Sequence, residues 1–169
     1  MAPIDRPETD AAPPQPPASE PKGCSNFRLH ALTRRMDQLY DAELAKVGLR
    51  TTQYSLLSHV VRLGPLRPGE LAQAMRLQPS SVTRNLQSLI AAGWVELGAG
   101  SDARSRSVSA TAAGREKRVQ AQRRWKAAQL ALNEALGADR VVALHALLDR
   151  CMIALDADGA TRPQGSEHG

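Results

Sequence analysis

Between residues 79 and 110 the spacing of apolar residues changes from that of a helix to the two-residue alternation of a strand. This change restricts the fold more than any other feature. After Pro79, apolar side chains recur three and four positions apart, and the pattern ends at Gly93. The recurring residues are Val82, Leu86, Leu89 and Ile90. Residues 94–97 and 107–110 then have the pattern of two short strands joined by a polar tip. A helix followed directly by a β-hairpin is therefore predicted.

Five further segments carry apolar residues at helical spacing. They are residues 25–47, 51–63, 68–75 and 112–135, with a last helix after Gly137. Thr51 and Thr111 are the predicted N-caps of the helices that follow them. Because only 3% of the residues are aromatic, we expect a core of Leu, Ala, Val and Met. The predicted fold class is mainly α with a small β-hairpin.

Charge is distributed unevenly along the chain, which has a formal net charge of +5. Residues 67–118 hold eight Lys and Arg residues against four Asp and Glu residues, and the predicted helix after Pro79 has no acidic residue. Such a local positive excess can mark a surface that binds a polyanion, but by itself it more often marks a solvated face. The order of the elements must therefore decide between these two interpretations.

The ends and the cysteines indicate the cellular setting. Residues 1–22 hold seven of the eleven prolines and almost no large apolar side chains, which predicts a disordered tail. A flexible C-terminal tail is expected over residues 157–169. Two cysteines are too few for a disulfide framework, and no apolar stretch approaches the roughly 20 residues that span a bilayer. A cytoplasmic protein with no membrane segment is expected.

A short helix, a tight turn, a second helix and a hairpin, in this order, form the layout of a winged helix-turn-helix. In such a unit the second helix enters the major groove of duplex DNA, and its N-terminal residues reach base edges. The candidate base contacts are Ser80, Ser81, Thr83, Arg84 and Gln87. The guanidinium of Arg84 suits guanine and the amide of Gln87 suits adenine, whereas Thr83 lies near the buried stripe and could simply pack. Arg104 and Arg106 at the hairpin tip are candidates for the minor groove, with solvated turn residues as the alternative.

These segments together resemble the MarR family of bacterial transcription regulators, over Cys24 to about Leu155. The resemblance is carried by LRTTQYSLLSHV, LRPGELAQAM, LQPSSVTRNLQSLIAAGWVE and SDARSRSVSATAAG. The wing pattern of the family falls on Asp102, Arg104, Thr111 and Gly114, whereas Ala110 stands where the family usually has leucine. The resemblance implies a homodimer whose first, fifth and sixth helices interlock, with two lobes that bind double-stranded DNA at a pseudo-palindrome.

The resemblance also predicts the domain organisation and a repressor function. A regulator domain is expected over residues 23–156, with dimerisation helices at 24–47 and 111–156 and the winged helix-turn-helix at 51–110. Members of this family are usually repressors that leave their operator when a small ligand, often an aromatic acid, binds or when a thiol is oxidised. We therefore expect a DNA-binding repressor that responds to a small molecule.

The resemblance further implies that the effector is a small aromatic carboxylate and that it binds between the dimer helices and the DNA-binding lobe. The candidate ligand residues are Asn26, His30, Arg34 and Tyr54. Arg34 and His30 lie one turn apart and could hold the carboxylate, although salt bridges between helices would explain them equally well. Cys24, at the start of the first helix, is the candidate for the alternative of redox sensing. A winged-helix module that binds another protein is the remaining alternative.

Other chemistry finds little support in the sequence. The four histidines and two cysteines have no recognised metal-ligand spacing, and neither a nucleophile elbow nor a phosphate loop is present. No enzyme activity, cofactor or metal is therefore expected. Cys151 lies on an apolar stripe and is predicted to belong to the core, and Trp94 and Trp125 are expected to pack.

Overall fold

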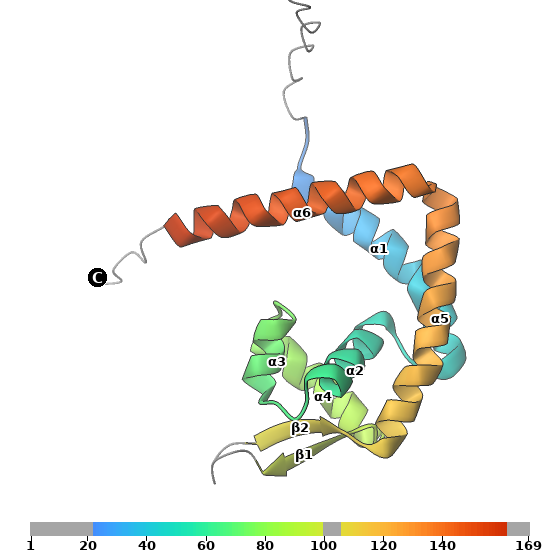
Figure 1. The fold of residues 1–169 in the computed structure, drawn as a ribbon, viewed down its shortest axis with the longest axis vertical. Helices are drawn as coiled ribbons and strands as arrows, with labels where there is room; N and C mark the ends of the chain where they lie inside the picture. The colour runs from blue at the N-terminus through green and yellow to red at the C-terminus, as the bar shows by residue number, and fades with distance from the viewer. Residues whose placement is uncertain (1–21, 100–105, 162–169) are drawn as a thin grey trace, which may run out of the picture.

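The computed structural model describes residues 22–99 and 106–161, and these parts of the chain form a mainly helical fold with one antiparallel hairpin (Figure 1). The elements are α1 (Ser25–Leu44), η1 (Ala45–Val47), α2 (Thr51–Leu63), α3 (Pro68–Ala74), α4 (Pro79–Ala91), β1 (Val95–Ala99), β2 (Arg106–Ala110), α5 (Ala112–Leu136) and α6 (Ala138–Thr161). The predicted fold class is thus confirmed.

The breaks between helices fall where glycine permits a left-handed backbone. Gly48, with φ of 70°, follows η1, and Gly93, with φ of 72°, separates α4 from β1. These conformations have no steric cost for glycine but strain most other residues. Both glycines were predicted as helix ends, and the structure confirms those ends.

The two predicted N-caps have different outcomes. Thr111 caps α5 as expected, because its Oγ1 accepts a hydrogen bond of 3.0 Å from the Gly114 N–H. Thr51 is instead the first residue of α2, and Arg50 occupies the N-cap position. The backbone N–H and hydroxyl of Thr51 both donate to Asp41 Oδ1, at 2.6 and 2.7 Å. The prediction for Thr51 was wrong because the carboxylate of Asp41 on α1 accepts these hydrogen bonds in the first turn of α2. Asp41 lies on another helix, so the sequence around Thr51 did not indicate this contact.

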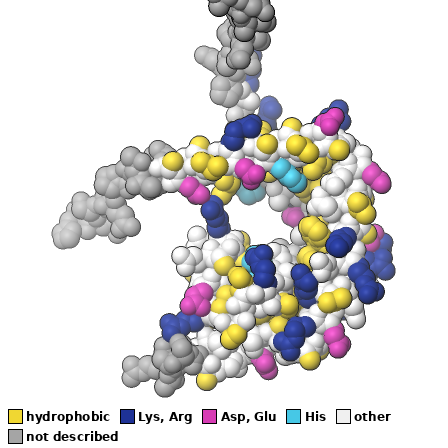
Figure 2. Space-filling model, viewed as in Figure 1, with side chains coloured by type: hydrophobic (Ala, Val, Ile, Leu, Met, Phe, Trp, Pro, Cys, Tyr) yellow, Lys and Arg dark blue, Asp and Glu magenta, His cyan; other side chains and the backbone are white. Residues whose placement is uncertain are grey.

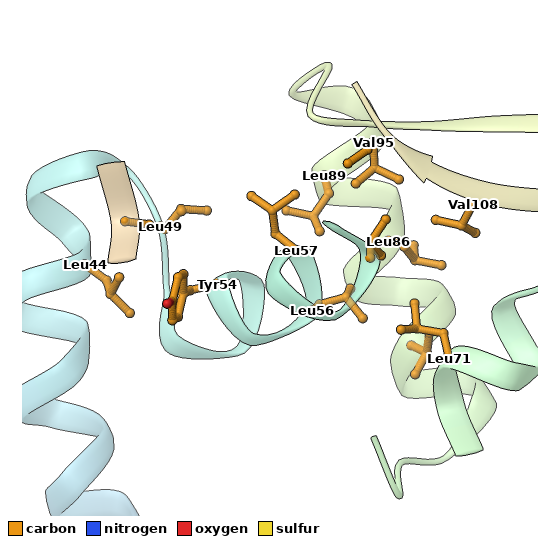
Figure 3. Close-up of a cluster of buried hydrophobic side chains, with 14 of the residues drawn as sticks. Leu44, Leu49, Tyr54, Leu56, Leu57, Leu71, Leu86, Leu89, Val95 and Val108 are labelled. Atoms are coloured by element: carbon orange, nitrogen blue, oxygen red, sulfur yellow. The ribbon is translucent and has the colours of Figure 1, made fainter. Parts of the chain in front are cut away.

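Helices α2, α3 and α4 and the hairpin form one lobe, which α5 connects to α6 (Figure 1). Leu57, Leu71, Leu89 and Val95 are buried at the centre of this lobe and converge from four different elements (Figure 3). The hairpin pairs Val95 with Ala110 at one end and Ala99 with Arg106 at the other. The segment before α3 joins the hairpin, since the backbones of Leu66 and Val108 exchange hydrogen bonds of 3.2 and 2.8 Å.

Outside the lobe, α1 packs along α5, and α6 runs back from the far end of α5 across the molecule (Figure 1). Helix α6 extends to Thr161, past the expected start of a flexible tail at Ala157. Val141 in its first turn is buried, but every residue from 145 to 157 is exposed. Cys151 is therefore exposed, and its predicted place in the core was wrong. The apolar stripe of α6 exists, but from residue 145 to residue 157 no other described helix of the same chain covers it.

The turn between α3 and α4 contains Arg76 in a left-handed conformation, with φ of 52°. Its guanidinium forms an ion pair of 3.1 Å with Asp156 on α6, and both side chains are more than half exposed. An exposed ion pair stabilises by less than about 1 kcal/mol, whereas a non-glycine residue pays roughly 1–2 kcal/mol for this backbone conformation. We therefore expect Arg76→Gly to raise the free energy of unfolding by up to about 1 kcal/mol in urea denaturation.

Arg76→Ala is the matched control for that substitution. Alanine removes the same ion pair but keeps the unfavourable backbone conformation, so this variant should unfold at a slightly lower urea concentration than the wild type. If the glycine variant proved less stable than the alanine variant, backbone strain at residue 76 would be too small to offset the flexibility of glycine in the unfolded chain.

Candidate nucleic-acid interface

Helix α4 presents one buried face and one exposed polar face. Pro79 is its first residue, a position where the missing N–H of proline costs nothing. Val82, Leu86 and Leu89 are buried against the rest of the lobe. The helix therefore stands on the lobe with its opposite side open to a partner.

The predicted base contacts are all exposed on this helix. At 100° per residue, Ser80, Arg84 and Gln87 lie within about 60° of one another and opposite the buried face, with Thr83 beside them. The Thr83 hydroxyl donates to the Pro79 carbonyl at 3.0 Å, which leaves its oxygen lone pairs available. Ser81 lies on the flank and lines a cleft with α2. The structure thus brings four of the five residues onto one face and places Ser81 at its edge.

Arg84 is the only cation on α4, and α4 has no acidic residue. Within the described residues its guanidinium forms neither a hydrogen bond nor an ion pair. An exposed guanidinium without a partner can offer its full fork of N–H donors to a base edge or a phosphate. The exposed face of α4 is thus a polar, cationic surface.

The hairpin contributes one described arginine. Arg106 is exposed at the start of β2, opposite Ala99. The Ser107 hydroxyl donates to the Ala99 carbonyl at 3.0 Å and reinforces the pairing near the end of the hairpin. Arg104, together with Asp102, lies outside the described residues, so its predicted role stays a prediction.

Contacts near the C-terminal end of α4 hold its orientation. Gln53 Nε2 on α2 donates to Ser88 Oγ at 3.2 Å. Beyond Gly93, the Thr111 hydroxyl donates to the Gly93 carbonyl at 2.7 Å, and the Thr111 N–H donates to the Trp94 carbonyl at 3.1 Å. The end of α4 is thereby tied to the start of α5. The sequence signalled Thr111 as a cap but did not signal these longer contacts.

Besides the cleft that Ser81 lines, two cavities lie near α5. One, of about 300 Å³, is bounded by α1, α5 and α6. It is lined mostly by apolar residues together with Asp37 and His145, and no described Lys or Arg lines it. Tyr40 also lines it, and burial raises the pKa of this phenol, whose hydroxyl donates to Gln129 Oε1. This cavity has an apolar and partly acidic character.

The second cavity is an open cleft of about 400 Å³ between α2 and α5. Its lining residues are Thr51, Tyr54, Ser55, Ser58, His59, Arg118, Gln122 and Trp125. Of the predicted ligand residues, only Tyr54 lies here. Asn26, His30 and Arg34 are exposed on α1 and line neither this cleft nor the cavity beside α6.

Trp125 packs as predicted, with its ring centroid 6.1 Å from that of Tyr40 and 6.4 Å from that of Tyr54. Trp94 is half-buried, and Lys117 Nζ lies 5.0 Å from its ring centroid. Sequence reasoning missed Arg118. The spacing of residues 118, 122 and 125 along one helical face was the available signal for this cleft.

Cys24, the candidate redox residue, occupies the N-cap position of α1 and is exposed, and Cys151 is exposed and also free. Within residues 22–99 and 106–161, no group of three or more His, Cys, Asp or Glu side chains is arranged to hold a metal ion. None of the helices in the described parts of the chain is long and apolar enough to cross a membrane.

Comparison with known proteins places this geometry in a family. A family model described as the MarR family matches residues 47–105. A mutant of MarR from E. coli, solved with operator DNA, is 25% identical with a TM-score of 0.68, and the match covers 75% of this chain and 91% of that one. MosR from M. tuberculosis, solved with DNA, is 29% identical with a TM-score of 0.65, over 79% of this chain and 98% of that one.

The fold extends to more distant sequences. MepR from S. aureus, also solved with DNA, has a TM-score of 0.68 at 15% identity, over 79% of this chain and 99% of that one. At this identity the likeness concerns the fold alone. No curated protein sequence is significantly similar to this chain.

Proposed function

Because this chain belongs to the MarR family of winged-helix, DNA-binding transcription regulators, we propose that it is a homodimeric repressor that a small ligand, an aromatic acid, releases from a pseudo-palindromic operator. The observation that carries the DNA-binding part is the acid-free, exposed face of α4 with the guanidinium of Arg84, which has no partner among the described residues. The repressor role and the release by a ligand rest on the resemblance to the family.

In the proposed complex, α4 lies in the major groove of each half-site. Ser80, Thr83, Arg84 and Gln87 contact base edges or nearby phosphates, with Ser81 at the margin. Arg106 at the start of β2 is proposed to reach the minor groove, and the same role is proposed for Arg104, which lies outside the described residues. The solved complexes of E. coli MarR with operator DNA and of M. tuberculosis MosR with DNA support this assignment.

The homodimer is supported by the apolar surface that α1 and α6 leave uncovered. Phe27, Val142, Ile153 and Leu155 are each more than two-thirds exposed. Figure 2 shows hydrophobic side chains along the whole length of α6 and an opening between α6 and the lobe. Apolar surface of this extent on a helix indicates a partner, and a second copy would bury it. Two lobes would then reach half-sites about 34 Å apart.

Arg84→Ala tests the recognition helix. We expect it to weaken binding to the operator by about 1–3 kcal/mol and to relax the preference at one base position, since a bidentate contact to guanine carries both effects. Fluorescence anisotropy with an operator selected from random duplex DNA, followed by single-base variants of it, would measure both quantities.

Arg150→Ala is the control, because it removes the same charge from an exposed position on α6, away from α4. It should leave the base preference unchanged. Unaltered affinity and preference in Arg84→Ala would exclude this residue from base recognition, and failure to select any duplex would favour the alternative of a protein-interaction module.

A further inference from the structure

We propose that the exposed side of the first half of α5 is a second DNA-binding surface, which holds the phosphate backbone of a separate duplex without regard to its sequence. This surface, which we call the α5 cationic face, consists of Arg115, Arg123 and Lys126. It lies on the helix that leads away from the lobe, apart from the face of α4 to which operator binding is assigned (Figure 1). The inference goes beyond the proposed function, because it adds a second nucleic-acid site to the same chain.

Positive charge is concentrated in one part of α5. Residues 115–126 hold six Lys and Arg residues against one acidic residue, Glu116. The rest of the helix, residues 127–136, has no Lys or Arg. Figure 2 shows Lys and Arg side chains gathered over α5 and the neighbouring α2. The charge of α5 therefore belongs to the half that is nearer the hairpin.

Half of these six cations lack a counter-ion. Three of them contact side chains of the same chain, namely Lys117, Arg118 and Arg124. The three residues of the α5 cationic face are exposed and form no ion pair within the described residues. Arg115 Nη1 donates to the Ala110 carbonyl at 2.6 Å, which holds this guanidinium beside the end of β2. The charge of this face is thus left for an anionic partner.

The three cations share one side of the helix. At 100° per residue they lie within about 80° of one another. The buried side of α5, marked by Ala121 and Ala128, is opposite to them, and α5 packs on α1 and α2. At a rise of about 1.5 Å per residue, Lys126 lies about 16 Å along the helix from Arg115. The face is therefore a cationic stripe that is open to a partner.

A stripe of this length and charge fits duplex DNA. A duplex carries one negative charge per about 1.7 Å of its axis, so a segment as long as the stripe offers several phosphates to three cations. Arg and Lys side chains that contact phosphates carry no sequence information. Release of the counter-ions condensed on the duplex drives such binding and makes it weaker as salt rises. We therefore expect binding that is independent of sequence and sensitive to salt.

Two other occupants fit this face less well. A helix that binds a membrane surface buries its apolar side in the lipid, but the apolar side of α5 is already packed within the chain. A second copy of the chain would bring the same positive charges to the contact, and a self-complementary interface of like charges repels itself.

The position of the face makes a separate duplex the expected partner. Arg106, the residue assigned to the minor groove of the operator, is at one end of β2, and Arg115 is held at the other end beside Ala110. From there α5 runs away from the lobe toward α6 (Figure 1). A duplex on this stripe is therefore a different segment from the one on α4, so one dimer can hold two segments of DNA together.

The test uses the full chain bound to an immobilised operator that was selected from random duplex DNA. A short duplex of unrelated sequence is added at about 50 mM salt, and biolayer interferometry measures its capture. We expect the wild type to capture this second duplex. Arg123→Gln with Lys126→Gln should weaken capture at least about fivefold and lower the slope of log affinity against log salt by about 1.8, because each neutralised phosphate contributes about 0.9. Operator affinity should stay within about twofold of the wild type.

Lys46→Gln with Arg124→Gln is the matched control. It removes the same amount of charge, and Arg124 is next to Arg123 in the sequence, but both Lys46 and Arg124 pair with Glu43. This variant should capture the second duplex as the wild type does. Equal loss of capture in the two variants would show that net charge attracts the duplex and would overturn the α5 cationic face.

Thermal unfolding separates a binding role from a structural one. Arg123 and Lys126 form neither a hydrogen bond nor an ion pair within the described residues, so their double variant should melt at the wild-type temperature. A wild type that captures no second duplex, or a double variant that captures it fully, would overturn the site. Capture of phosphatidylglycerol vesicles in place of DNA would overturn it as well.

Failure of this site and failure of the proposed function give different results. If the chain selects no operator, the proposed function fails, and the unrelated duplex is titrated into the free protein instead. Binding that Arg123→Gln with Lys126→Gln weakens and Arg84→Ala does not would support the α5 cationic face. The reverse result would overturn it.

Discussion

Gly114→Ala is expected to destabilise the protein by about 4 kcal/mol, among the largest effects that one methyl group can have. A Cβ at residue 114 would lie 1.9 Å from the Trp94 carbonyl oxygen and 2.8 Å from its carbonyl carbon. Both atoms are backbone, and the same carbonyl accepts the Thr111 N–H, so neither can move without breaking the junction between hairpin and α5. Urea denaturation of the purified variant would measure the loss.

Gly69→Ala is the matched control for Gly114→Ala. A Cβ at residue 69, in the first turn of α3, would have no atom within 4 Å. Alanine is the better helix former, so this variant should be as stable as the wild type or up to about 1 kcal/mol more stable. A Gly114→Ala protein that lost less than about 1 kcal/mol would mean that α5 can move away from Trp94 at little cost.

The combined substitution of Val142→Asp and Ile153→Asp is expected to abolish dimerisation and to lower operator affinity by at least about 100-fold, because linked binding of two half-sites adds roughly 10²–10⁴ to the affinity of one. Val142 and Ile153 are 68% and 70% exposed. They are eleven residues apart, so they share one face of α6 to within about 20°. That face is opposite the stripe of Leu144, Leu148 and Leu155, and no other described helix of the same chain covers it.

Light scattering at micromolar concentration would determine the oligomeric state of the variant. Gel-shift titration would measure its affinity for the operator. The control is Val142→Leu with Ile153→Leu, which keeps both positions apolar and should remain a dimer that binds DNA. A stable dimer of the aspartate variant would show that this face of α6 is not the interface. A monomeric wild type would remove the two-lobed model of DNA binding.

The order of the helices, most of their bounds and the polar face of α4 followed from the sequence alone. The apolar stripe from Val82 to Leu89, the end of the helix at Gly93 and its start at Pro79 are local signals. The helical spacing of apolar residues, the backbone freedom of glycine and the missing N–H of proline each act within a few residues of the chain. The same local geometry put Ser80, Arg84 and Gln87 on one exposed face. No contact between distant segments was needed for either inference.

The tertiary structure alone decided which distant groups meet. Asp41 of α1 binds Thr51, the backbone of Trp94 excludes a side chain at residue 114, and Arg118 lies across a cleft from Ser58. The spacing of apolar residues tells which face of a helix is apolar but not which other helix covers that face. Cys151 was therefore predicted to lie in the core, although no described helix of this chain covers it. Pairings between segments depend on the packing of whole helices, and no local pattern encodes them.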